Sequence, residues 1–242
     1  MTKVKEKTIA PWSEAEFKKQ LEMIGKNRYH HHHPFHKKMH EGKLSKYELR
    51  SWIINRFYYQ LNLPVKDAII LSKLPRREDR RIWINRIIDH DGPPFGSNSA
   101  NKGGIEAWLQ LARAAGIPEE TMYDKNAVNS GTKFAVDAYV NFCRNESWYE
   151  AVASSLTELF APDLISRRID VFEKYYPWIK SEGLVYFQNR LTQAPADCDH
   201  ALKLVLKNGT NREMQIKAVN ALNFKCDVLW SLLDAIDQRR VV

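Results

Sequence analysis

The spacing of the apolar residues constrains the fold of this chain more than any other feature. Over long stretches they recur every three to four positions, as in the segment after Ser45, where Leu49, Trp52 and Ile53 fall on one face of a helix. Sheet proteins instead alternate apolar and polar residues with a period of two. Only ten of the 242 residues are glycine. We therefore predict an all-α protein.

Local signals place the ends of the helices. Ser13 with Glu16 and Ser45 with Glu48 have the spacing of capping boxes, which begin helices. The stretch DGPPFGSNSANKGG, residues 91–104, is the clearest loop in the chain. The predicted helices cover 13–25, 34–41, 45–74 with a kink or restart at Pro64, 76–90, 105–115, 118–123, 131–144, 147–160, 164–174, 179–193, 196–207 and 211–238.

The length and the hydrophobic content of 44% suit one domain with a sizeable core, although two small domains would also fit. We predict a flexible N-terminus over residues 1–12 and a single helical domain over 13–242. Cys143, Cys198 and Cys226 are widely spaced and form no CxxC pair, so neither a disulfide framework nor a zinc ribbon is indicated. Such sparse cysteine use fits a reducing compartment.

The N-terminus MTKVKEKTIAPW lacks the apolar region of a signal peptide. The most apolar late stretch, DVLWSLLDAI, is too short and too acidic to span a bilayer. We therefore expect a cytoplasmic protein with no membrane association. The formal net charge of +8 raises the question of nucleic acid binding, but lysine and arginine are spread along the chain and clusters such as RREDRR alternate with acids. A polyanionic small substrate explains the charge better.

Charged residues recur on helix faces that the apolar spacing assigns to the core. The stripe through Leu49 and Ile53 continues to Arg56 and Gln60. Four other helices repeat this pattern, with Arg86 and His90, Glu158, Tyr186 and Arg190, and Lys225. Burying several unpaired charges is costly, and we expect Glu158 to neutralise only one of the cations. A central cavity that binds a polycarboxylate is the economical interpretation, and a structural network of ion pairs is the alternative.

Several segments also resemble a known family. The stretches YHHHHPFHKKMHEG, NRFYYQLNLPVKDA, RRIWINRIIDHDG, GGIEAWLQL, SSLTELFAP and YYPWIKSEGLVYFQNRL are similar, in this order, to segments of the pyrroloquinoline-quinone synthases (PqqC), within the heme-oxygenase-like and TenA-like superfamily. The resemblance extends from about residue 15 to about residue 235. It implies a heme-oxygenase-like bundle of about seven main helices around a central polar cavity, and a homodimer.

The resemblance also implies an activity. Enzymes of this family are oxidoreductases that close a ring and carry out an eight-electron oxidation of a reduced bicyclic precursor (AHQQ) with O2. The products are pyrroloquinoline quinone (PQQ) and hydrogen peroxide. They need no metal and no organic cofactor, because the electron-rich substrate reduces O2 itself and O2 is a co-substrate. The precursor carries several carboxylates, as the charge pattern requires.

Residue roles follow from the same resemblance. His90, Tyr186 and Arg190 are the predicted catalytic residues. His90 is suited to proton transfer because the unperturbed pKa of histidine is near neutral, and the other two are suited to stabilising an oxygen anion. No metal ligand is predicted. The predicted carboxylate-binding cations are Arg56, Lys66, Arg86, Arg168 and Lys225. The other predicted substrate-binding residues are Tyr29, His30, Tyr59, Gln60, Tyr139, Thr157 and Glu158.

Two features fall outside these roles. Six of the eight histidines lie in the run YHHHHPFHKKMH, residues 29–40. His36 and His40, four residues apart, could ligate a metal, but packing, capping or surface roles are commoner for such histidines, and only His30 is expected to contact substrate. Two departures from the family are a longer 91–104 loop and Ile165, which stands where at least one member has a histidine.

Three alternatives remain. A metal-dependent oxidase of the same fold needs His and carboxylate ligands on the late helices, where only Asp197 and His200 are available and Arg190 would repel a cation. A thiamin-degrading hydrolase needs a nucleophilic cysteine in the cavity, and no base is evident beside Cys143 or Cys226. A non-catalytic PQQ-binding or precursor-binding protein would need only the cations, so the predicted catalytic residues favour an enzyme.

Overall fold

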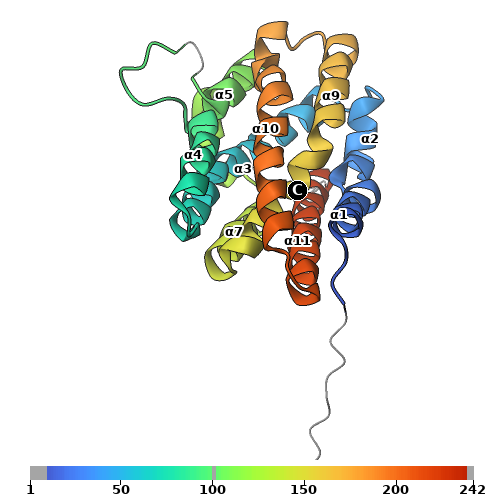
Figure 1. Cartoon of the computed structure of the whole chain (residues 1–242). Helices are drawn as coiled ribbons and strands as arrows, with labels where there is room; N and C mark the ends of the chain where they lie inside the picture. Colours follow the sequence, from blue (N-terminus) through green and yellow to red (C-terminus); the bar gives the residue numbers. More distant parts are fainter. Residues whose placement is uncertain (1–9, 100–101, 239–242) are drawn as a thin grey trace, which may run out of the picture.

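The computed structural model describes residues 10–99 and 102–238, and within these ranges all regular structure is helical (Figure 1). The all-α prediction is therefore confirmed. The α-helices are α1 (Glu14–Arg28), α2 (Pro34–His40), α3 (Lys46–Lys73), α4 (Arg77–Asp91), α5 (Gly104–Ala114), α6 (Glu119–Tyr123), α7 (Ser130–Asn145), α8 (Trp148–Ser154), α9 (Ala161–Tyr175), α10 (Val185–Asn208) and α11 (Arg212–Asp237). Four 3₁₀ turns join them: η1 (His30–His32), η2 (Lys125–Ala127), η3 (Ser155–Phe160) and η4 (Ser181–Leu184).

Both predicted capping boxes are present. The backbone N–H of Glu16 donates to Ser13 Oγ at 3.3 Å, and the backbone N–H of Ser13 donates back to the Glu16 carboxylate at 2.8 Å. The pair Ser45 and Glu48 repeats this exchange at 3.2 and 2.8 Å. Two backbone groups that the helix itself leaves without partners are thus satisfied at the start of α1 and of α3.

Two prolines lie inside helices. Pro64 lies inside α3, whose range agrees with the predicted helix over 45–74 and which does not restart there, so the kink at Pro64 stays a prediction. Pro195 lies inside α10, where two separate helices were expected, and that prediction was wrong. A proline in a helix interior removes one backbone hydrogen bond and costs about 3 kcal/mol. Here α3 packs against α4, α5 and α7, and α10 packs against α8, α9 and η3. We attribute the continuity of both helices to this packing, which outweighs the local loss.

A second difference lies after α8. One helix was expected over residues 147–160, but α8 ends at Ser154 and the chain tightens into the 3₁₀ turn η3. Runs of 3₁₀ structure longer than three to four residues are uncommon, because their hydrogen bonds are poorly aligned. Six residues of η3 therefore mark an unusual segment, and it contains the predicted site residues Thr157 and Glu158.

The helices form one bundle around a continuous core (Figure 1). In this view α4 and α5 lie on one side of α10, while α1, α2 and α9 lie on the other. The packing pairs place α11 against α1, α7 and α8. Trp52, Trp83 and Trp108 are fully buried, and the indole N–H of Trp108 donates to the Ile53 carbonyl at 2.9 Å. No helix among the described residues is at once long and apolar enough to cross a membrane.

Of the predicted flexible segment, residues 1–9 lie outside the described residues. Trp12 is fixed to α11, because its backbone N–H donates to Gln215 Oε1 at 2.7 Å and the Gln215 amide donates back at 2.9 Å. The Arg212 guanidinium lies 3.8 Å from the centroid of the indole ring. The division into a flexible terminus and one domain stays a prediction.

The histidine run is mainly a packing element at the start of α2. The backbone N–H of Phe35 donates to His33 Nδ1 at 3.0 Å, and His33 Nε2 lies 3.0 Å from Asp234 Oδ1 on α11. His36 Nδ1 lies 3.1 Å from the carbonyl of His30. His33 therefore caps α2 and ties it to α11, as expected for a capping and packing role.

Candidate functional site

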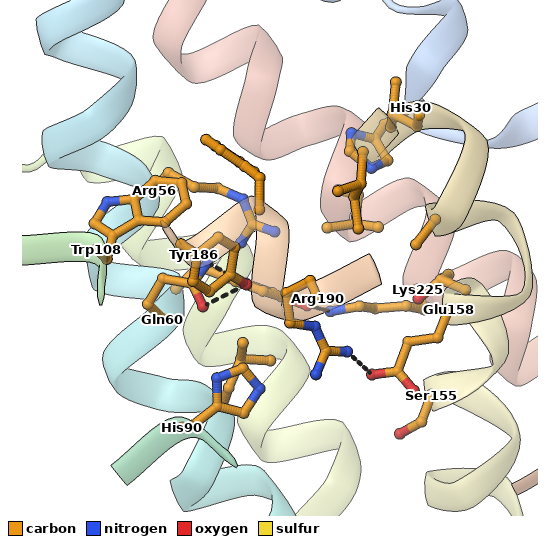
Figure 2. A pocket seen from close by; sticks show the side chains of 18 of the residues that line it. His30, Arg56, Gln60, His90, Trp108, Ser155, Glu158, Tyr186, Arg190 and Lys225 are labelled. Atoms are coloured by element: carbon orange, nitrogen blue, oxygen red, sulfur yellow. Dashed lines mark hydrogen bonds and ion pairs between the residues drawn. The ribbon is translucent and has the colours of Figure 1, made fainter. Parts of the chain in front are cut away.

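A cavity of about 100 Å³ lies inside the bundle. Side chains from α3, α4, α5, α7, α9, α10 and α11 reach it, together with η3 and the segment before α2 (Figure 2). The sequence-predicted residues that line it are Tyr29, His30, Arg56, Tyr59, Gln60, Lys66, His90, Tyr139, Thr157, Glu158, Arg168, Tyr186, Arg190 and Lys225. Residues far apart in the sequence thus meet at one place.

Arg86 is the exception, since it does not line this cavity. Its side chain is 3% exposed, and its Nη1 donates to Glu158 Oε2 at 2.8 Å. Its Nη2 donates to the backbone carbonyl of Asp197 at 2.5 Å. The position of Arg86 thus favours a structural role behind the cavity wall, and its predicted contact with substrate stays untested.

Arg86 belongs to a buried ionic network with Glu158, Arg190 and Asp197. Arg190 donates to Glu158 Oε1 at 3.3 Å, which Figure 2 shows, and to Asp197 Oδ2 at 3.2 Å. The Glu158 carboxylate contacts two guanidiniums, but its single negative charge balances only one of them, as expected, and Asp197 supplies the second negative charge. Asp197 was weighed only as a metal ligand, and its role as the second anion of this network was missed.

The network perturbs its two carboxyl groups in opposite directions. Burial alone would raise the pKa of Glu158, but the adjacent Arg86 and Arg190 guanidiniums hold it below its usual value. Burial and then the charge of Glu158 raise the pKa of Asp197 to about 6. The predicted catalytic residue Arg190 is therefore held in place by two acids, and part of its charge is already balanced in the ligand-free protein.

Three other cations have no carboxylate partner among the described residues, and we call Arg56, Arg168 and Lys225 the uncompensated cations. The Arg56 guanidinium lies 3.8 Å from the Tyr59 ring centroid, and its Nη1 is buried without a partner. Burial lowers the pKa of Arg168 to about 10. Unpaired buried charge is unfavourable unless an anion arrives to balance it, so this side of the cavity attracts anions.

Lys225 is the uncompensated cation whose charged form is most strongly disfavoured in the ligand-free cavity. Its ammonium donates to the Tyr59 hydroxyl at 2.7 Å and lies 3.3 Å from the centroid of the Tyr139 ring. Burial lowers the pKa of Lys225 well below its usual value, and the charges of Lys66 and Arg56 lower it further. Its charged form is therefore disfavoured until an anion enters the cavity.

Lys66 differs from the uncompensated cations. It donates to Asp67 Oδ1 at 2.7 Å and to Ser155 Oγ at 3.2 Å. Burial alone would lower the pKa of Lys66, but the carboxylates of Asp67 and Glu158 together hold it above its usual value. Lys66 thus stays charged and already has an anion beside it, so we assign it less capacity for a ligand carboxylate.

His90 lies at the opposite end of the cavity from His30 (Figure 2). Its Nδ1 is buried and has no hydrogen-bond partner within the described ranges 10–99 and 102–238. Burial lowers the pKa of His90 well below its usual value, and the charges of Arg190 and Lys66 lower it further. The cavity thus shifts His90 away from the near-neutral unperturbed pKa of histidine, and the ligand-free cavity holds a neutral imidazole. Such a group accepts a proton readily only when an anion is beside it.

Tyr186 and Gln60 form the polar link between α10 and α3. The Gln60 amide donates to Tyr186 Oη at 2.9 Å, which Figure 2 shows, and the Tyr186 ring packs edge-on against Trp108 with centroids 4.9 Å apart. A β-carbon added at Gly104 would lie 3.1 Å from His90 Nδ1 and 3.3 Å from Tyr186 Cε2. The absence of a side chain at Gly104 therefore leaves both predicted catalytic residues their space.

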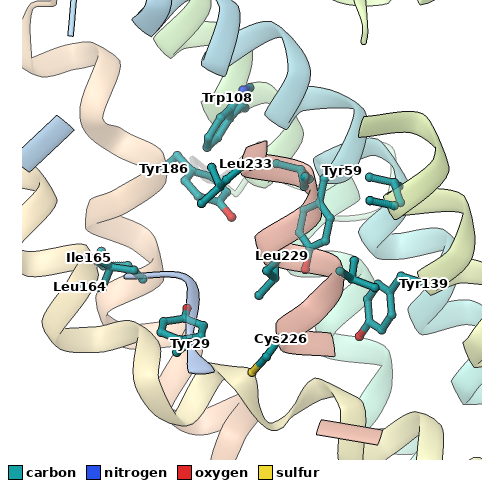
Figure 3. Close-up of a cluster of buried hydrophobic side chains, with 14 of the residues drawn as sticks. Tyr29, Tyr59, Trp108, Tyr139, Leu164, Ile165, Tyr186, Cys226, Leu229 and Leu233 are labelled. Carbon is teal, nitrogen blue, oxygen red and sulfur yellow. The ribbon is translucent and has the colours of Figure 1, made fainter. Parts of the chain in front are cut away.

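The apolar part of the wall was largely missed by the sequence prediction. Trp108, Leu164, Ile165, Phe187 and Leu229 line the cavity, and Figure 3 shows four of them among the tyrosines of the site. Ile165 faces the cavity as an apolar group at the position where a histidine was noted in the family. The only signal for these residues was their place on the same apolar stripes, which does not distinguish core from cavity wall.

No group of three or more His, Cys, Asp or Glu side chains in the described part of the chain is placed to hold a metal ion. His36 and His40 are close, with ring centroids 6.1 Å apart, but His36 Nε2 lies 3.3 Å from the Arg168 guanidinium. The cysteines are buried thiols outside the cavity lining. Burial raises the pKa of Cys198 and of Cys226 to about 12, which makes nucleophilic attack by either thiol unfavourable.

Solved structures define the class to which this bundle belongs. A domain of unknown function with a heme-oxygenase-like fold from Shewanella denitrificans aligns with a TM-score of 0.72, covering 93% of this chain and 92% of that one at 9% identity. A TenA homologue from Pseudomonas syringae aligns with a TM-score of 0.71, covering 95% and 94% at 15% identity. The fold is heme-oxygenase-like, as predicted.

Sequence comparison gives the particular family. The model of the TENA/THI-4/PQQC family matches residues 18–235, and the chain belongs to this family. It is 49% identical over 227 residues to the pyrroloquinoline-quinone synthase of Ectopseudomonas mendocina, covering 94% of this chain and 88% of the relative. It is 50% identical over 228 residues to the enzyme of that name from Pseudomonas aeruginosa, with the same coverage. The family resemblance predicted from the sequence is confirmed.

Proposed function

We propose that this protein is a pyrroloquinoline-quinone synthase, an enzyme that closes the last ring of PQQ and oxidises the bicyclic precursor AHQQ with O2, releasing hydrogen peroxide. The observation that carries the proposal is the set of uncompensated cations in a buried cavity that also contains His90, Tyr186 and Arg190. A polycarboxylate balances these charges, and a neutral substrate does not. The high identity to relatives that bear this name supports the same activity.

In the proposed mechanism the uncompensated cations bind the carboxylates of the precursor where little water competes. The bound anion raises the proton affinity of His90, so its neutral imidazole can accept a proton from the substrate. Loss of that proton makes the substrate ring electron-rich enough to reduce O2 directly. Arg190 and Tyr186 then stabilise the anion that forms on oxygen, with Arg190 held in place by Glu158 and Asp197.

The finer expectations belong to the same proposal. The enzyme works without a metal or organic cofactor, with O2 as co-substrate, because the precursor supplies the electrons. It acts as a homodimer in the cytoplasm, which the family resemblance and the unpaired cysteines support. It binds neither nucleic acid nor membrane, since the excess of positive charge has a use inside the cavity.

The test is anaerobic mixing of chelator-treated protein with the precursor, followed by admission of O2. We expect quinone absorbance to rise and hydrogen peroxide to be released. His90→Asn should abolish turnover and keep binding, while His200→Asn is the matched control, because His200 does not line the cavity. Binding without turnover in the wild-type protein would indicate a carrier. Activity that returns only with added iron would indicate a metal-dependent oxidase.

A further inference from the structure

A second hollow of about 440 Å³ lies outside the cavity, between α1, α2, η3 and α9. We call it the outer pocket. Its basic residues are Lys26, His31, His40 and Arg167, and Glu22 is its acidic one. The proposed reaction does not use any of these side chains.

The outer pocket and the cavity share a thin wall. Leu164 lines both spaces, and the Phe160 ring in the outer pocket packs edge-on against Tyr29 of the cavity, with centroids 5.5 Å apart. On α9, Arg167 lines the outer pocket while its neighbour Arg168 lines the cavity. Cations therefore stand on both sides of the wall that Phe160 and Leu164 form.

This wall has to move if a large ligand is to enter. Pockets that bind drug-sized ligands measure roughly 300–1,000 Å³, whereas the cavity measures about 100 Å³. The Phe160 ring lies over the bare backbone of α1, because a β-carbon at Gly25 would be 2.1 Å from Phe160 Cε1. Phe160 is half-buried and ends η3, whose hydrogen bonds are those of a 3₁₀ turn. The ring therefore stands between the outer pocket and Tyr29 of the cavity, and it occupies space that a side chain at position 25 would fill.

The chemistry of the outer pocket suits carboxylates. Lys26 and Arg167 are exposed, and neither has an ion-pair partner within the part of the chain that the structure describes. His40 is only 8% exposed, yet its Nε2 has no hydrogen-bond partner among the residues that the structure describes. Burial and then the charges of Arg168 and Arg167 lower the pKa of His40 to about 4. The imidazole ring is therefore uncharged near pH 7 and can donate one N–H to an anion.

We propose that the outer pocket is a carboxylate-binding vestibule through which the polycarboxylate substrate enters, with Phe160 as the gate to the cavity. This inference rests on the proposed function. Lys26 and Arg167 attract the anion electrostatically, and His40 Nε2 binds one of its carboxylates. Phe160 then moves from its place over Gly25, and the carboxylate passes from Arg167 to Arg168.

The test measures the association and dissociation rates of PQQ by stopped-flow quenching of tryptophan fluorescence at several salt concentrations. Electrostatic steering contributes about tenfold or more to association at low salt and fades as salt rises. The double variant Lys26→Glu with Arg167→Glu should lose that factor and its salt dependence, with little change in dissociation. The matched control is Lys125→Glu with Lys207→Glu, two exposed lysines outside both pockets, which should keep the wild-type rates.

The gate is tested separately with Phe160→Ala. Association and dissociation should both accelerate by about fivefold or more, with the dissociation constant within about threefold of wild type, because a gate changes the barrier and not the end states. Phe134→Ala, a 76% exposed phenylalanine on α7, is the control. Unchanged association rates in both sets of variants would overturn the vestibule while leaving the proposed function intact. A wild-type protein that does not bind PQQ would overturn the proposed function, and the vestibule with it.

Discussion

Replacing Arg86 by methionine separates a structural role of this guanidinium from a ligand-binding one. Arg86 and Arg190 together balance the carboxylates of Glu158 and Asp197, whose side chains are 21% and 11% exposed. Without Arg86, one guanidinium remains for two buried acids. Removing one partner of a buried ion pair costs about 3–5 kcal/mol. For a chain of this size that corresponds to a melting temperature lower by about 6–20 °C.

The pH dependence of this loss follows from Asp197, whose pKa is raised to about 6. A carboxyl group with a raised pKa binds more protons in the folded state than in the unfolded state, where its pKa is about 4. Its contribution to stability is therefore full below about pH 4 and is lost as the pH rises through about 6. Removing Arg86 raises this pKa further, so the variant should regain about 1–2 kcal/mol relative to wild type between pH 7.5 and pH 5.5.

Urea unfolding of the wild-type protein and of Arg86→Met at pH 7.5 and pH 5.5 measures these differences in the free energy of unfolding. Lys203→Met is the matched control, because it removes an ion pair at the surface. The side chains of Lys203 and Asp199 in this pair are 73% and 62% exposed. Such a surface pair contributes less than about 1 kcal/mol. If Arg86→Met lost less than about 1 kcal/mol while PQQ binding disappeared, the structural interpretation would be refuted. Arg86 would then be a ligand-binding cation, as the family resemblance implies.

Three further predictions concern the cavity. Lys225→Met should stabilise the ligand-free protein by about 1 kcal/mol or leave its stability unchanged, because it removes a disfavoured buried amine. The same change should weaken PQQ binding at least about tenfold. Urea unfolding measures the first effect and fluorescence titration the second, and a large loss of stability would contradict the reasoning. Gly104→Ala should lower kcat more than PQQ affinity, since the new methyl group lies 3.1 Å from His90 Nδ1; equal losses in both would argue against a specific effect on His90. PQQ binding near pH 7 should take up protons, because the pKa of His90 is lowered in the empty cavity and rises beside an anion. Calorimetry in buffers of different ionisation enthalpy detects this uptake, and heats independent of the buffer would contradict it.

The sequence predicted the helices well where the signals are local. The capping boxes at Ser13 and Ser45 and the apolar spacing each depend on residues within a few positions of one another. The prediction failed at Pro195, because there the outcome depends on packing between helices distant in sequence. The 3₁₀ turn η3 was likewise read as a continuation of α8, since its residues carry no local signal for a tighter turn.

The sequence predicted which residues line the cavity, but it did not predict which of the cations form ion pairs. Helical spacing placed cations on inner faces, and the family resemblance completed the set that meets in the cavity. Which cations are balanced was hidden, since Arg86 contacts Asp197 across 111 positions of sequence. Lys66 and Asp67 are neighbours in sequence, but adjacent residues of a helix do not face each other, so a pair between them is not expected.

The division between balanced and uncompensated cations bears on how a substrate would lie. Arg190 is balanced by acids and stands near His90, so a carboxylate gains little by binding there. The uncompensated cations offer the larger gain, because none of them has a carboxylate partner among the described residues and a ligand carboxylate supplies the anion that each lacks. A polycarboxylate should therefore place its acids among the uncompensated cations, which leaves its reacting ring toward His90 and Arg190. A monocarboxylate would leave most of that positive charge unbalanced, so the same arrangement selects for substrates with several carboxylates.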